Sequence, residues 1–194
     1  MSTLYTDNIR ANNASQITLP TGQKIVGTDS GSIVAPGHVL QVKQTYMQTQ
    51  VIYSTNNSMN NVPELNCTIT PKLASSKIFV TINFNYSCSN QGCGHGLALD
   101  REIGGVNSGD IARGIGGTTV DVWTGLDNNF GQANSSGIVM NACGNYLDSP
   151  NTTSAITYKP KVYIINGASP IKMNRSDSGA IGAASTMTLM EIAQ

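Results

Sequence analysis

The clearest pattern in the chain is an alternation of apolar and polar residues over residues 78–86. Apolar side chains occupy every second position: Ile78, Val80, Ile82, Phe84 and Tyr86. Successive side chains of a strand point to opposite faces of a sheet, so a two-residue period is the pattern of a half-buried strand. We therefore predict a strand here that presents one face to a hydrophobic core.

Shorter runs of the same kind recur along the chain, separated by turn-forming residues. The predicted strands are 39–53 (one long strand or two shorter ones), 65–69, 96–101, 137–140, 158–165, 171–173 and 186–192. Many short strands without a sustained helical period are typical of an antiparallel β-sandwich or jelly roll. The Gly- and Asn-rich stretch 102–136 is predicted to form long loops at one end of this sandwich.

Residues 1–36 carry a different pattern. Their apolar residues come singly or in pairs between turn formers such as Pro20, Gly22 and Gly27. Strands of roughly three to five residues cannot close a core alone. We therefore predict an extended, β-structured arm that is ordered by association with a partner or with copies of itself, and a flexible tail is the alternative. The predicted domains are this arm, 1–36, and a sandwich body, 37–194.

The amino-acid composition excludes several classes of protein. The chain has 194 residues, of which 11% are charged, and its 11 Lys and Arg balance its 11 Asp and Glu. A protein that neutralises many phosphates needs an excess of basic residues, so we expect no nucleic-acid partner. No stretch approaches the ~18 consecutive apolar residues of a spanning helix, so no membrane insertion is expected. The first residues lack a secretory pattern, and the cysteines are therefore expected to be reduced thiols.

One group of residues resembles a metal site. Cys88, Cys93 and His95 lie close together in the sequence, and Cys143 could add a fourth ligand. Structural zinc sites usually contain two pairs of ligands about two to four residues apart. The second pair is missing here and the first spacing is long, so we predict no metal and no cofactor. A local disulfide between Cys88 and Cys93 stays open as an alternative.

The sequence contains few of the residue combinations that catalytic sites require. A nucleophilic hydrolase needs a His base, and the chain has only His38 and His95, with no Gly-x-Ser-x-Gly turn around any serine. A glycosidase needs two facing carboxylates. Two pairs could be proposed, Asp121 with Asp127 and Asp100 with Glu102, but solvated acids at strand edges and in loops explain these positions better. We predict no catalytic residue and no enzyme activity.

Trp123 is the only tryptophan, and polar residues follow it closely. An aromatic ring beside Asn and Asp side chains is a common way to stack on a sugar and hydrogen-bond it. This pattern marks Trp123, Asp127, Asn128 and Asn129 as a candidate contact with a host receptor. The alternative is that Trp123 is a core residue of a strand, because Val120 and Val122 precede it, and this alternative is the better supported.

Several stretches, taken in order, resemble a known family. They are Ile17-Thr18-Leu19-Pro20 and Lys24-Ile25-Val26-Gly27-Thr28-Asp29 in the arm, then Ala35-Pro36-Gly37-His38-Val39-Leu40-Gln41-Val42, Thr68-Ile69-Thr70-Pro71, Tyr146-Leu147-Asp148-Ser149-Pro150 and Thr188-Leu189-Met190-Glu191-Ile192-Ala193. Each motif is a turn plus a strand, and their order and the ending are more specific than any one of them. The chain resembles small fibre-like virion proteins of tailed bacteriophages, common among marine and cyanobacterial phages.

The resemblance implies a trimeric appendage with a thin N-terminal part on the virion and a β-sandwich head. It brings no catalytic motif. It also implies a structural role for the segment 147–150, in which Asp148 or Ser149 caps the turn before Pro150. The arm residues expected to attach to the virion are Ile9, Ile17, Leu19, Ile25 and Val26.

We therefore expect a homotrimeric tail or neck fibre that helps the particle attach to a glycan or protein of the host surface. Its location would be the virion, assembled in the host cytoplasm, with other virion proteins bound through the arm. A capsid decoration or head-fibre protein that stabilises the shell without binding a receptor is the alternative. A depolymerase that trims host polysaccharide is a third hypothesis, for which the sequence nominates no carboxylate pair.

Overall fold

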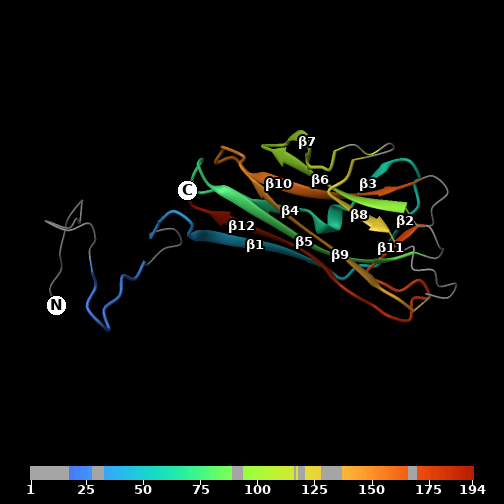
Figure 1. Ribbon diagram of the computed structural model, residues 1–194, viewed down its shortest axis with the longest axis horizontal. Coiled ribbons are helices and arrows are strands. Elements are labelled where there is room, and N and C mark those ends of the chain that lie inside the picture. Colours follow the sequence, from blue (N-terminus) through green and yellow to red (C-terminus); the bar gives the residue numbers. More distant parts are fainter. Residues whose placement is uncertain are drawn as a thin grey trace. The chain divides into compact units, whose positions relative to one another are not determined.

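The computed structural model (Figure 1) divides the chain into two units, Met1–Ile33 and Val34–Gln194. The sequence prediction ended the arm at residue 36. The structure describes residues 18–27, 33–88, 94–115, 117, 121–127, 137–165 and 170–194.

The regular secondary structure described in the second unit is β-strand, apart from one 3-10 turn. In chain order the elements are β1 (Val39–Met47), β2 (Val51–Tyr53), β3 (Met59–Asn61), the 3-10 turn η1 (Pro63–Leu65), β4 (Cys67–Ile69), β5 (Lys77–Ser87), β6 (Gly94–Ile103), β7 (Val106–Ala112), β8 (Thr124–Asp127), β9 (Met140–Asp148), β10 (Ile156–Ile164), β11 (Ile171–Met173) and β12 (Ser185–Ile192).

The strands form two six-stranded sheets in which the pairings are antiparallel. Sheet A has the order β1-β12-β5-β11-β2, and β9 pairs with the other edge of β5. Sheet B has the order β3-β10-β6-β7, with β4 on β10 and β8 on β6. Their inner faces enclose one hydrophobic core to which both sheets contribute. The predicted all-β antiparallel sandwich is therefore confirmed, whereas the predicted trimer stays a prediction.

Strand β5 shows how the sequence pattern becomes structure. Its alternating apolar residues are all buried in the core: Ile78, Val80, Ile82, Phe84 and Tyr86. Strand β12 lies beside it with the same alternation, and its buried members include Met187 and Leu189. The two strands thus bury one face each, as a two-residue period requires.

Some predicted boundaries are wrong. The strand expected at 137–140 begins only at Met140 and runs on to Asp148 as β9. The stretch 102–136, expected to form loops, contains β7 and β8. Both strands contain few apolar residues, and both are formed by backbone pairing with β6. The segment 39–53 forms the two shorter strands β1 and β2, which was one of the two alternatives.

The described part of the arm, residues 18–27 and 33–36, contains turns and no strand. The N–H of Gln23 donates to the carbonyl of Pro20 at 3.0 Å, and Gly22 adopts a φ of 83° that favours glycine. Ile25 and Val26 leave 68% and 69% of their surface exposed, and Leu19 is exposed as well. Ile9 and Ile17 lie outside the described residues.

Candidate functional site

The outer face of sheet A carries neutral rows of side chains that cross four strands, β1, β12, β5 and β9. The strand registers align Val42, Met190, Phe79 and Leu147 in one apolar row. Val42 and Leu147 are exposed, and Met190 and Phe79 are half-buried. The row therefore forms an apolar band that the sandwich itself leaves uncovered.

Two polar rows continue this face without introducing a charge. They are Gln44, Thr188, Thr81 and Asn145, followed by Tyr46, Thr186, Asn83 and Cys143. The amide of Gln44 donates to the Thr188 hydroxyl at 2.8 Å, so part of this surface is already hydrogen-bonded within the sheet. We call the three rows together the neutral face. Apolar and neutral polar side chains in this arrangement are suited to contact with another uncharged surface.

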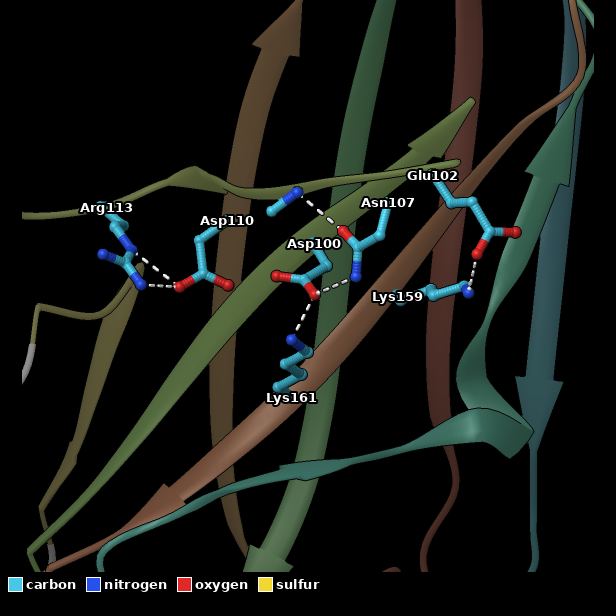
Figure 2. Close-up of polar contacts among 8 residues, drawn as sticks. Asp100, Glu102, Asn107, Asp110, Arg113, Lys159 and Lys161 are labelled. Carbon is cyan, nitrogen blue, oxygen red and sulfur yellow. Dashed lines mark hydrogen bonds and ion pairs between the residues drawn. The ribbon is translucent and has the colours of Figure 1, made fainter. Parts of the chain in front are cut away.

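The outer face of sheet B is charged instead. Its strands β6 and β10 carry acids and lysines at alternating positions, and their side chains form the ion pairs Lys159–Glu102 and Lys161–Asp100 (Figure 2). The sequence suggested Asp100 and Glu102 as a carboxylate pair. Each of them is instead matched with its own lysine across the strands, which neutralises this face locally.

Strand β7 brings a second carboxylate to Asp100. Asp110 lies directly opposite Asp100 in the β6–β7 register, which is irregular on both sides of this pair. Asp100 is 1% exposed, and the side chain of Asp110 is 8% exposed. Asn107 donates to Asp100 Oδ2 at 3.2 Å, and Arg113 donates from Nε to Asp110 Oδ2 at 2.7 Å. No signal in the sequence announced this pair, because a strand irregularity sets its register.

The two carboxyl groups titrate in opposite directions. Burial and the adjacent Asp100 carboxylate raise the pKa of Asp110 against the opposing effect of Arg113. Burial alone would also raise the pKa of Asp100, but hydrogen bonds with Asp110, Lys161 and Asn107 outweigh it and lower that pKa. Asp110 is therefore the member of the pair that holds a proton more readily.

A polar link joins the two sheets through the core. Arg101 of β6 donates from Nη1 to both carboxylate oxygens of Asp148 of β9, at 2.8 and 3.0 Å. The hydroxyl of Tyr158, on β10, donates to Asp148 Oδ2 at 2.7 Å. Burial and the Asp148 carboxylate raise the pKa of Tyr158, which keeps this donor protonated. The carboxylate of Asp148, which the sequence offered along with Ser149 as a turn cap, is thus engaged in a link between the sheets.

Trp123 packs against the hydrophobic core, at the side of the sandwich where β8 meets β9. Its indole Nε1 donates to the carbonyl of Asn145 at 3.3 Å. The ring covers Gly144 so closely that a Cβ there would lie 2.8 Å from two ring atoms. Of its predicted partners, Asp127 contributes its backbone to β8, while Asn128 and Asn129 lie outside the described residues. The receptor contact stays a prediction.

The cysteines and histidines form no metal site in the part of the chain that the structure describes, where no three His, Cys, Asp or Glu side chains could hold an ion. Cys88 and His95 are buried and Cys143 is exposed. Cys93 lies outside the described residues, so the alternative of a disulfide with Cys88 stays open. The same described residues contain no helix long and apolar enough to cross a bilayer.

Comparison with known proteins gives no family. No protein-family model matches the chain, and no curated protein matches it. Among solved structures, the chain is similar to that of infectious bursal disease virus Gx strain, with 11% identity, a TM-score of 0.40 and coverage of 88% of this chain and 47% of that one. It is also similar to the VP2 subviral particle of infectious bursal disease virus, with 9% identity, a TM-score of 0.37 and coverage of 89% and 42%. The chain thus spans less than half the length of these proteins.

Proposed function

We propose that this chain is a structural component of a bacteriophage particle, a homotrimeric tail or neck appendage that helps the particle attach to its host. The observation that carries the proposal is the arm. Ile25 and Val26 of the first unit expose about two-thirds of their surface, 68% and 69%. Apolar side chains left in water gain free energy when a partner covers them, about 25 cal/mol per Å².

The neutral face supports assembly from identical copies. Its apolar row, Val42 to Leu147, spans the sheet from edge to edge, and the two polar rows on one side of it carry no charge, whereas Lys77 lies on the other side. Desolvating a charge is costly, so a surface without charges is the least costly one to bury between subunits. The outer face of sheet B, which carries the ion pairs Lys159–Glu102 and Lys161–Asp100, is the face that would remain in solvent.

Composition and the resemblance agree with this function. Only 11% of the residues are charged, and the net charge is zero. Such a surface hydrogen-bonds with little dependence on salt, which suits a particle component exposed to changing surroundings. The resemblance to fibre-like virion proteins of tailed phages supplies the expected location and the attachment role of the arm.

Native mass spectrometry of the full-length protein tests the assembly. We expect a multiple of three protomers, and we expect Val42→Lys to shift the population toward single chains because it places a charge in the apolar row. Val106→Lys is the matched control, since Val106 is an exposed valine on β7 of the other sheet. A protein that stays monomeric at high concentration would overturn the trimer.

Incorporation into particles tests the arm. The double variant Ile25→Ser, Val26→Ser should fold normally and yet be depleted from purified particles. Normal incorporation would show that these residues do not attach the protein. Binding to whole host cells then separates an attachment fibre, which should bind cells and block infection, from the alternative decoration protein, which should bind empty capsids instead.

A further inference from the structure

The two carboxyl groups of Asp100 and Asp110 each have one oxygen engaged and one oxygen turned toward the other group (Figure 2). Asp100 Oδ2 accepts from Lys161 and Asn107, and Asp110 Oδ2 accepts from Arg113. Asp100 Oδ1 is buried and has no hydrogen-bond donor. A buried carboxylate oxygen without a donor, opposite another carboxylate, is unfavourable unless something lies between them.

The charges around the pair indicate whether a metal cation or a proton lies between the two carboxylates. Lys161 comes from β10 and Arg113 from the segment after β7, and together they balance the two carboxylates. The next charges on the outer face of β6 and β10, Glu102 and Lys159, neutralise each other, and Arg101 lies on the inner face with Asp148. Beyond Arg113, Asp121 accepts from the N–H of Gly117 at 2.8 Å. A divalent cation would add two positive charges to this balanced group, whereas a proton adds only one and needs only the two oxygens that face each other.

We propose that Asp110 carries a proton which it donates to Oδ1 of Asp100, and that this shared proton holds strand β7 on β6. It converts two opposed carboxylates into a hydrogen bond across the strands. When the proton leaves, two like charges face each other in a site from which water is largely excluded. Strand β7 is an edge strand that pairs only with β6 among the described residues, so it is the element that can separate.

The titration directions fit this arrangement. The raised pKa of Asp110 means that the folded state binds this proton more tightly than the unfolded chain does. The stabilisation is complete below the ordinary Asp pKa of about 3.9 and is lost as pH rises toward the folded-state pKa of Asp110. Asp100, whose pKa is lowered, stays ionised through this range and remains the acceptor. The β6–β7 pair is therefore tighter in acid than at neutral or alkaline pH.

Hydrogen exchange and carboxyl NMR on the full-length protein test the proposal. In the wild-type protein, the opening equilibrium constant of the β7 amides should rise by up to about tenfold per pH unit while Asp110 titrates, after correction for intrinsic exchange. The amides of β1, an edge strand of the other sheet, are the internal reference. The side-chain carboxyl carbon of Asp110 should titrate above the ordinary Asp range.

Asp110→Asn provides the decisive variant, because the amide can donate permanently to Asp100 and still accept from Arg113. It should remove the pH dependence of β7 opening and keep the strand closed, while Asp121→Asn should leave that dependence unchanged. The proposal is overturned if Asp110→Asn retains the wild-type dependence. It is equally overturned if the wild-type Asp110 carboxyl titrates at or below the ordinary value, a measurement that does not require the variant to fold.

Discussion

Removing the hydroxyl of Tyr158 tests the polar link between the sheets. Tyr158 is fully buried, so Tyr158→Phe keeps the ring packing and deletes only the hydrogen bond to Asp148 Oδ2 at 2.7 Å. The Asp148 carboxylate still accepts from Arg101, and therefore no buried charge loses its last partner. The change isolates one charge-assisted hydrogen bond inside the core.

The contacts of Tyr158 and Asp148 set the expected changes in the free energy of unfolding. A hydrogen bond to an ionised acceptor contributes about 1.5–3 kcal/mol to stability, so Tyr158→Phe should lower the free energy of unfolding by that amount. Asp148→Asn should have a larger effect, about 3–5 kcal/mol, because it leaves the mostly buried guanidinium of Arg101 without its counter-charge. Tyr158 and Asp148 share a contact, so the double variant should be less destabilised than the sum of the two single variants.

Urea unfolding followed by fluorescence and circular dichroism measures these differences as shifts in midpoint at constant slope. Tyr163→Phe is the matched control, since Tyr163 is a second buried tyrosine of the same strand, and its side chain lies on the outer face, away from Asp148. It should change stability by less than about 0.5 kcal/mol. If Tyr158→Phe and Tyr163→Phe unfold at the same midpoint, the link does not stabilise the sandwich and the reasoning fails.

Two further substitutions probe the core and its edge. Trp123→Ala should lower the free energy of unfolding by about 3 kcal/mol, the lower end of the range for core aromatic residues, because the ring is only partly buried. A variant with an unchanged melting curve would assign the ring to ligand contact instead. Glu191 is fully buried, and although burial would raise its pKa, hydrogen bonds from Gln41 and the backbone N–H groups of Leu73 and Lys72 lower it. The ionised Glu191 carboxylate therefore stabilises the folded state above the ordinary Glu pKa of about 4.3, and this stabilisation is lost as pH falls through the folded-state pKa. Glu191→Gln should reduce the fall in the free energy of unfolding at acid pH, measured by urea unfolding at a series of pH values.

The sequence predicted the strands that bury one whole face. Over 78–86 the apolar alternation is unbroken, and β5 follows it. Strand β7 was missed because Asn107, Ser108, Gly109 and Asp110 interrupt its apolar residues, and it is a strand only because β6 supplies its hydrogen bonds. Pairing of this kind depends on a neighbour distant in sequence, which a local pattern does not contain.

The site was less accessible from sequence than the fold. The neutral face depends on the registers of four strands, and these join residues such as Val42 and Met190 that lie far apart in the chain. The lysines at 159 and 161 and the acids at 100 and 102 did alternate with period two, which is a signal for ion pairs between neighbouring strands. Without the register, however, that signal could not reveal that Asp110 opposes Asp100.

The position of β12 in sheet A bears on how the protein is made. This strand follows all the other strands that the structure describes, yet it lies between β1 and β5 and pairs with both. A nascent chain leaving the ribosome therefore holds β1 and β5 apart, with their apolar faces uncovered, until residues 185–192 emerge. Sheet A can therefore close only once residues 185–192 have been made, and until then the uncovered apolar faces of β1 and β5 favour aggregation.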